Sequence, residues 1–184
     1  MVPRIDAGDA VSNQVLSIHR LVTQWGCESR IYANGMDEFG KRFASYDHAY
    51  REFMGEEDDL LIYHFSIYCS NHEMFTATRN RKVLIYHNIT PAEFYDRFYP
   101  EAAHLCRLGR ELLPRLSECD LALGDSDFNR REMVAAGFPE ERTGVLPIHP
   151  PLDQLGGVGE DRALLRRLDD GSVNFLFVGR VVPN

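Results

Sequence analysis

The 184-residue chain contains 44% hydrophobic and 26% charged residues, a balance that excludes global disorder and supports one globular domain with a fragment of a second. Its net charge is −8 and it has no long Lys/Arg stripe, which argues against a nucleic-acid-binding protein. No apolar run approaches the ~20 residues of a membrane helix, and the N-terminus lacks the apolar core of a signal peptide. The sequence therefore predicts a soluble, cytoplasmic protein.

The cysteines and histidines give no metal-binding pattern. Cys27, Cys69, Cys106 and Cys119 are widely spaced, without a Cys-x-x-Cys or a Cys/His pair at zinc-ligand spacing. The seven histidines do not cluster either. We therefore expect free, mostly buried thiols and no structural metal.

Short apolar runs alternate with longer amphipathic segments along the chain. The strands are expected at 29–33, 60–65, 82–87, 121–124 and 143–147, after a short first strand within residues 1–8 that includes Pro3. Runs that are apolar on both faces are typical of buried parallel strands.

Three helices are expected between these strands. The first begins after Asp9, a plausible N-cap, and ends before Gly26; its apolar residues fall on one stripe of Val11, Val15, Ile18, Val22 and Trp25. The others span 101–116 and 126–136, the last closed by Gly137.

The alternation of strands and helices predicts an α/β fold with a Rossmann-like, doubly wound parallel sheet. We place this domain at residues 1–154. A glycine-rich linker and a short charged helix follow at 155–172, and residues 173–184 begin a second domain with a strand at 174–178 (NFLFV). Twelve residues cannot bury a core, so a truncated second domain is expected.

Ligands of open parallel sheets bind at the carboxyl ends of the strands, which directs attention to residues 8–9, 64–66, 87–90, 125–127 and 148–151. Gly8 and Asp9 open the first helix, where backbone N–H groups could hold a phosphate, although a turn with an N-cap explains them equally well. His87 follows a strongly apolar strand and precedes Asn88; it could bind a hydroxyl or phosphate, or merely cap the loop. We take His87 as the candidate catalytic residue and Asn88 as a candidate donor- or acceptor-binding residue. His64 is more readily interpreted as part of its strand.

Two further strand-end residues are candidates for binding. Ser126 is foremost an N-cap, and the helix start that it caps could also bind a ligand. It lies in Gly-Asp-Ser-Asp-Phe, which is not a nucleophile elbow. Arg180, at the end of NFLFVGR, could bind a diphosphate or be an ordinary surface arginine.

Taken in order, these segments resemble glycosyltransferase family 4, whose members are retaining enzymes of the GT-B fold. The similar segments are 8–13 (GDAVSN), 26–32 (GCESRIY), 86–91 (YHNITP), 123–126 (LGDS), 131–139 (REMVAAGFP), 145–151 (VLPIHPP) and 177–180 (FVGR). They cover the chain from about Gly8 to Asn184, and the set in this order is more specific than any single segment.

The resemblance implies that the chain is the N-terminal, acceptor-side part of a hexosyltransferase-type enzyme that uses a UDP- or GDP-linked sugar. Gly8 and Asp9 would face the sugar nucleotide, His87 would lie near the transferred sugar, and Arg180 would bind the donor diphosphate. The remaining donor contacts, a lysine and two glutamates, would lie after Asn184, so this chain alone is expected to be inactive. The family implies no metal and no cofactor beyond the sugar nucleotide.

Alternative functions remain open at this stage. The chain could be a stand-alone, non-catalytic α/β binding or interaction module, or a GT-B relative such as a sugar-nucleotide epimerase or a phosphorylase. Its expected partners are an acceptor glycan or small molecule, the missing C-terminal domain, a second copy paired through exposed strands, and a membrane surface. Tyr95, Phe98 and Tyr99 could stack on a sugar or lipid, or form the core face of a helix.

Overall fold

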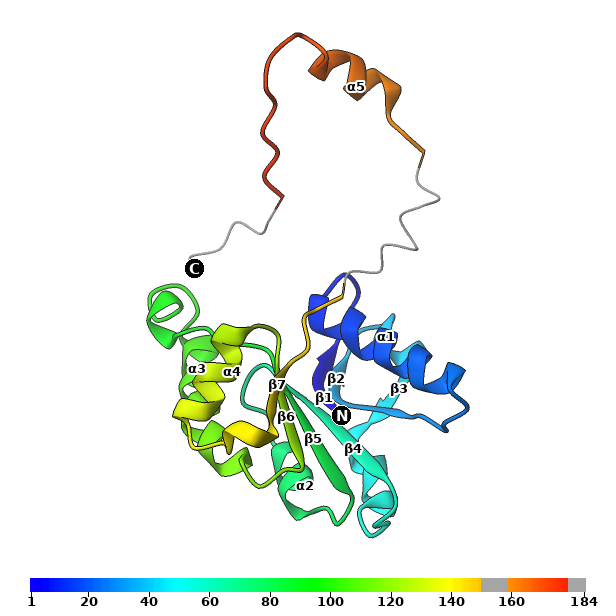
Figure 1. Ribbon diagram of the computed structural model, residues 1–184, viewed down its shortest axis with the longest axis vertical. Helices are drawn as coiled ribbons and strands as arrows, with labels where there is room; N and C mark the ends of the chain where they lie inside the picture. The colour runs from blue at the N-terminus through cyan, green and yellow to red at the C-terminus, as the bar shows by residue number, and fades with distance from the viewer. Residues whose placement is uncertain (150–158, 179–184) are drawn as a thin grey trace. The chain divides into compact units, whose positions relative to one another are not determined.

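All strands of this protein run parallel, in two sheets within the part of the chain that the computed structural model describes, residues 1–149 and 159–178 (Figure 1). The first sheet has the order β1-β2-β3, with bounds Val2–Ile5, Ile31–Met36 and Ala44–Tyr46. The second has the order β4-β5-β6-β7, with bounds Leu60–Phe65, Arg81–Tyr86, Leu121–Gly124 and Thr143–Val145. This confirms the predicted α/β, Rossmann-like class.

The two sheets meet where β1 lies beside β4. The Met1 nitrogen donates to the Ile62 carbonyl at 2.6 Å, and the His64 nitrogen donates to the Met1 carbonyl at 2.9 Å. The Asn71 amide adds a bond to the Val2 carbonyl at 3.0 Å. Successive strands therefore run outward from β1 on one side and from β4 on the other. The strand order reverses at this point, which is where open α/β sheets bind their ligands.

Helix α1 (Ala10–Gln24) packs on the first sheet, against a small core of Val2, Ile5, Val15, Ile31 and Ala33. The predicted caps are confirmed: Asp9 accepts from the Ser12 nitrogen at 2.8 Å, and Gly26 has a φ of 84°. The predicted apolar stripe is wrong at its end, because Trp25 is 70% exposed. This residue is the C-cap, beyond the part of the helix that contacts the sheet.

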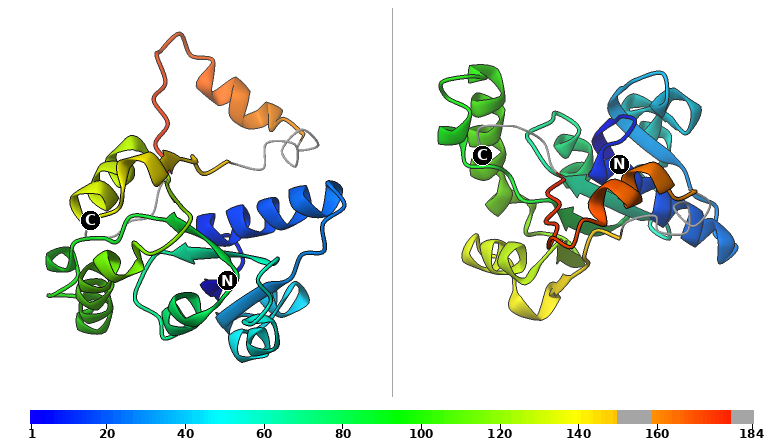
Figure 2. Two further views of the ribbon diagram at one scale, coloured as in Figure 1. Left: turned by 60° about the horizontal axis from the view of Figure 1, so that its bottom comes forward. Right: turned by 90° about the horizontal axis from the view of Figure 1, so that it is seen from above.

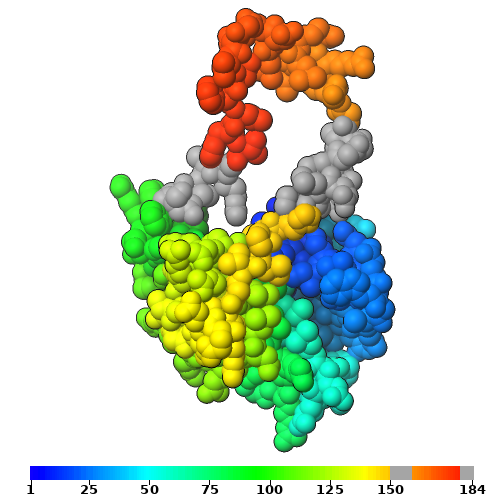
Figure 3. Space-filling model, in the orientation of Figure 1, coloured from blue at the N-terminus to red at the C-terminus, as the bar shows by residue number. Residues whose placement is uncertain are grey.

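The larger core lies under helices α2 (His72–Ala77), α3 (Pro100–Leu112) and α4 (Asp127–Ala135). It contains alternate residues of the second sheet, Tyr63 and Phe65 of β4 and Leu84 and Tyr86 of β5. Figure 2 shows α1 and α2 on opposite sides of the strands. Helix α4 packs on β6 and β7. In the space-filling view, the lime-to-yellow residues that include α4 and β7 form one closely packed region of the surface (Figure 3).

Several predicted boundaries need correction. β2 begins at Ile31, after residue 29, and β5 ends at Tyr86, so that His87 follows the strand. The helix expected at 101–116 is α3 followed by a 3-10 helix, because Pro114 cannot continue the α-helical bonding. The sequence did not predict β3 or α2, both of which are short. The 3-10 helices are η1 Gly40–Arg42, η2 Asp47–Phe53, η3 Ala92–Phe94, η4 Leu113–Leu116 and η5 Glu140–Arg142.

The chain divides into two compact units, residues 1–150 and 151–184. The described part of the second unit contains α5 (Arg162–Leu168), N-capped by Asp161. The strand predicted at 174–178 is wrong: these residues pair with no strand, and the side chains of Phe175–Val178 are 84–94% exposed. An apolar run becomes a strand only when a neighbour supplies backbone partners. Arg180, the 154/155 boundary and linker residues 155–158 lie outside the described residues.

Two expectations about the chain as a whole can be compared with the structure. All four cysteines are free, and three of them are buried while Cys27 is exposed, which confirms the prediction. Across residues 1–149 and 159–178, no helix is both long enough and apolar enough to cross a membrane.

Candidate functional site

The carboxyl ends of β4, β5 and β6 bring three titratable side chains into one chain of hydrogen bonds. The register aligns Phe65 with Tyr86 and Tyr86 with Gly124, so the residues just after β5 and β6 are neighbours. His64 Nδ1 lies 2.9 Å from His87 Nε2, and His87 Nδ1 lies 2.9 Å from Asp125 Oδ2. We call His64, His87 and Asp125 the relay.

The relay is buried at its histidine end and reaches the surface at its carboxylate end. The two imidazole rings stack with 5.2 Å between centroids and an interplanar angle of 10°. The His87 side chain is 1% exposed, whereas the Asp125 side chain is 16% exposed. Burial, and secondarily the neighbouring His87, hold the pKa of His64 well below its usual value. His64 is therefore neutral near pH 7.

The donors and acceptors of the relay follow from its chemistry. A carboxylate only accepts hydrogen bonds, so His87 Nδ1 carries the hydrogen that bonds Asp125. When His87 is neutral, its Nε2 accepts from Nδ1–H of His64. The hydrogen bonds of the relay therefore run in one direction, from His64 to His87 to Asp125.

A second network fixes the loop that carries His87. The Tyr86 hydroxyl donates to Glu132 Oε2 at 3.2 Å and accepts from the Ile89 nitrogen at 3.2 Å. Arg110 donates to the Ile89 carbonyl at 2.6 Å and to Glu132 Oε1 at 2.7 Å. Burial is the main cause that raises the pKa of Tyr86 to about 12. The Tyr86 hydroxyl therefore keeps its proton and remains a donor.

Between His87 and Ile89, Asn88 has a φ of 46°, a left-handed conformation that asparagine tolerates better than most residues. Its side chain is exposed, while those of both neighbours are buried. This left-handed residue lies at the predicted site. The backbone that follows it is fixed by two hydrogen bonds, one from the Ile89 nitrogen to Tyr86 and one from Arg110 to the Ile89 carbonyl.

The other candidate residues have capping roles in the structure. Asp9 caps α1 through bonds to both the nitrogen and the hydroxyl of Ser12, each 2.8 Å long. Gly8 has a φ of 73°, which explains a glycine there. Ser126 caps α4: its Oγ accepts from the Asn129 nitrogen at 3.3 Å and donates to Asn129 Oδ1 at 2.7 Å. Gly8, Asp9 and Ser126 do not contact the relay through any of these bonds.

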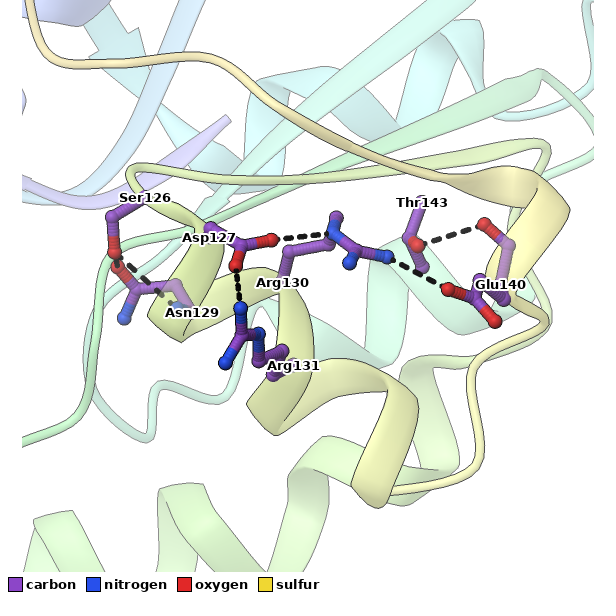
Figure 4. Close-up of polar contacts among 7 residues, drawn as sticks. All are labelled: Ser126, Asp127, Asn129, Arg130, Arg131, Glu140 and Thr143. Atoms are coloured by element: carbon purple, nitrogen blue, oxygen red, sulfur yellow. Dashed lines mark hydrogen bonds and ion pairs between the residues drawn. The ribbon is translucent and has the colours of Figure 1, made fainter.

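The first turn of α4 carries one acidic side chain, Asp127, whose charge is balanced by two arginines. Asp127 accepts from Arg130 Nε at 3.0 Å and pairs with Arg131 at 2.6 Å, and Arg130 extends to Glu140 at 3.3 Å (Figure 4). These side chains lie on the outer face of the helix and tie it to the segment before β7. Both arginines are thus occupied by carboxylates.

Some buried polar atoms near this edge of the sheets have no hydrogen-bond partner among the described residues. They are Asp6 Oδ1, Gln14 Oε1, Asp125 Oδ1 and Asn129 Nδ2. Asp6 follows β1, and Gln14 lies on α1, whereas Asp125 and Asn129 flank the start of α4. Three of the four atoms are acceptors, so this region has unused capacity for a hydrogen-bond donor.

A separate pocket of about 320 Å³ lies at the opposite edge of the second sheet. Its lining comprises Phe75, Thr76, Lys82, Arg115, Leu116 and Glu118. Lys82 is at the beginning of β5, far along the strand from His87, and none of the relay residues lines the pocket. We therefore place the candidate site at the carboxyl edge. No group of three or more His, Cys, Asp or Glu side chains in the described ranges is arranged to hold a metal ion.

Sequence reasoning identified His87 but assigned no role to Asp125 and favoured a strand position for His64. A usable signal was present: His87 follows the last residue of β5 by one position, and Asp125 follows the last residue of β6 by one position. Equal offsets on adjacent parallel strands place side chains side by side. No family model, no curated protein and no solved structure matches this chain.

Proposed function

We propose that this domain is the acceptor side of a retaining glycosyltransferase, which transfers a sugar from a UDP- or GDP-linked donor to an acceptor hydroxyl. The observation that carries the proposal is the position of His87, one residue beyond β5 at the carboxyl edge of a Rossmann-like sheet, in a buried relay ending at Asp125. The resemblance in the segment YHNITP supports the same interpretation.

The relay supplies what a sugar-transfer site needs on the acceptor side. Hydroxyl groups of a sugar are recognised by fixed polar groups such as carboxylates. His87 is buried and bonded at both ring nitrogens, so in this proposal it positions Asp125, the partly exposed end of the relay. A front-face transfer needs stabilisation of the departing diphosphate rather than a protein nucleophile, and the proposal assigns no nucleophile to this domain.

The charges near the two helix starts support a donor diphosphate held mainly elsewhere. Asp9 caps α1 with its carboxylate, and Asp125 immediately precedes the cap of α4. Carboxylates at these positions disfavour a second anion. In the proposal, Arg180 and a donor-binding domain hold the diphosphate, while residues 8 and 9 only face the sugar nucleotide. The predicted cytoplasmic location fits the nucleotide-sugar supply and remains a prediction.

A non-catalytic interaction module is the second candidate, and one observation favours it. Phe175, Leu176, Phe177 and Val178 expose between 84% and 94% of their surface. Four consecutive exposed apolar side chains are unusual on a protein surface unless another surface covers them. A partner subunit or a second copy of the chain would then use this segment.

The test measures nucleoside diphosphate released from UDP- and GDP-linked sugars by the complete gene product, whether or not it extends beyond this chain. His87→Gln should lower kcat/KM by about a hundredfold, because it removes the N–H that orients Asp125 and a small misplacement of a substrate-binding group can cost that much. His104→Gln is the matched control, since His104 is an exposed histidine of α3.

Thermal unfolding of each variant separates loss of activity from loss of folding. The proposal fails if the complete product releases no nucleoside diphosphate with any acceptor glycan tried, or if His87→Gln is as active as His104→Gln. Binding to a protein partner without any sugar transfer would favour the interaction module.

A further inference from the structure

The pocket at the amino edge of the second sheet has walls that the chain itself holds in place. Its lining residues belong to α2, to the start of β5, and to η4 with the residues directly after it. The nitrogen of Lys82 donates to Asp120 Oδ2 at 2.7 Å, and the Asp120 nitrogen donates to the Lys82 carbonyl at 2.9 Å. The Ser117 hydroxyl donates to the Pro114 carbonyl at 2.8 Å, which fixes the turn between them. The pocket is therefore formed before any ligand enters.

Two positive side chains line this pocket without a carboxylate partner. Within residues 1–149 and 159–178, neither the Lys82 ammonium nor the Arg115 guanidinium forms an ion pair. Lys82 is half-buried, and its Nζ lies 5.9 Å from the centroid of the Phe75 ring. An anion gains more from a partly desolvated ammonium than from one in bulk water. Glu118 also lines the pocket, so the lining carries a net single positive charge.

The volume and the apolar part of the lining limit what the pocket can hold. About 320 Å³ is at the lower limit of small-molecule sites and would hold on the order of ten waters. A lone inorganic anion would fill only a small part of this volume. Phe75 and Leu116 are each 1% exposed and close the inner end of the pocket, and the methylene stems of Lys82 and Arg115 add apolar surface. An organic anion fits this combination best.

We propose that this pocket binds a small organic carboxylate, whose charged group accepts hydrogen bonds from Lys82 and Arg115. Both side chains only donate, and the guanidinium fork matches the geometry of a carboxylate. Glu118 would repel a ligand with two negative charges, and the two cations would repel a positively charged ligand. The pocket contains none of the relay residues, so the inference is independent of sugar transfer.

The test titrates the full chain, uniformly ¹⁵N-labelled, with benzoate and with hexanoate at neutral pH. These two probes carry the same charged group on a flat and on a flexible skeleton. Benzamide has the skeleton of benzoate without its charge, and inorganic phosphate has charge without a skeleton. We expect saturable shifts at the backbone amides of Thr76, Lys82 and Glu118, and none at Asn88, beyond the other end of β5. Benzamide and phosphate should bind at least about tenfold more weakly than benzoate.

Four variants test which charges matter. Lys82→Met and Arg115→Met keep a long apolar side chain and remove the charge, so each should weaken benzoate binding at least about tenfold. Arg81→Met is the matched control, because Arg81 is exposed, precedes Lys82 on the opposite face of β5 and does not line the pocket. It should bind benzoate as the wild type does. Glu118→Gln removes the repelling carboxylate and should strengthen binding roughly threefold.

The amide spectra also show whether each variant is folded, so loss of binding is separated from loss of structure. The inference is overturned if neither carboxylate gives a saturable shift, or if Lys82→Met and Arg115→Met bind benzoate as tightly as Arg81→Met. Equal affinity for benzamide would show an apolar cavity, and equal affinity for phosphate would show a simple ion site. Shifts centred on Asn88 would place the carboxylate at the relay instead.

Discussion

The carboxylate of Asp125 accepts a hydrogen bond of 2.9 Å from His87 Nδ1, although 38 residues separate the two in the chain. This bond joins the loop after β5 to the start of α4. It also sets the tautomer of His87, because a carboxylate requires a hydrogen on the nitrogen that faces it. The bond to His64 on the other ring nitrogen then has a defined direction.

Replacing Asp125 by asparagine should change this tautomer. The amide nitrogen that Asp125→Asn introduces cannot accept from His87 Nδ1, so His87 would lose its preference for a hydrogen at Nδ1. Imidazole ¹⁵N shifts should show Nδ1–H for the wild type and a mixture of tautomers for Asp125→Asn. We also expect the free energy of unfolding to fall by about 1–3 kcal/mol. Identical ¹⁵N shifts in both proteins would contradict the relay geometry.

His64 should make the protein less stable in weak acid. Its pKa in the folded state lies well below the unfolded value, chiefly because of burial, so the unfolded chain takes up a proton that the folded chain does not. Stability should therefore decrease as the pH falls below about 6.5, by up to about 1.4 kcal/mol per pH unit for this one group. Urea unfolding between pH 7 and pH 5 measures the slope.

In the same experiment, His64→Gln should reduce this slope, whereas the exposed His104→Gln should leave it unchanged. A slope that is the same in all three proteins would show that His64 does not titrate as its burial requires.

The Tyr86 hydroxyl should hold the strained loop in place. Tyr86→Phe removes the donor to Glu132 and leaves the Ile89 nitrogen without its acceptor. The free energy of unfolding should fall by about 1–3 kcal/mol, and amide exchange at Asn88 and Ile89 should become faster. The matched control is Tyr99→Phe, at an exposed tyrosine. Unchanged exchange at Ile89 would mean that the Tyr86 network does not restrain the loop.

The cysteines should differ sharply in reactivity in the native protein. Cys27 is exposed, whereas Cys119 is 4% exposed and burial raises its pKa to about 11. Because the thiolate is the reactive species, iodoacetamide at neutral pH should modify Cys27 first and Cys119 only after unfolding. Peptide mass spectrometry of timed samples measures the order. Early modification of Cys119 would show that its surroundings open in the native state.

Local signals in the sequence were sufficient for most of the fold. Leu60–Phe65 and Leu121–Gly124 were predicted with the bounds that the structure has, because buried parallel strands are short runs of apolar residues between polar turns. The caps Asp9 and Ser126 were predicted because capping is a bond between residues three positions apart. The short β3 and α2 carry too few residues to show a period.

The candidate site was only partly accessible to the same reasoning. His87 is recognisable because it follows an apolar strand, and its partners are not, since they lie 23 and 38 residues away. These side chains meet because of the register of β4, β5 and β6. A glycine at position 124 also lets the start of α4 lie close to the end of β6. The sequence by itself determined the elements and their caps, which arise from contacts between near neighbours. Only the tertiary structure decided which strand ends meet, because that depends on backbone pairing between distant segments.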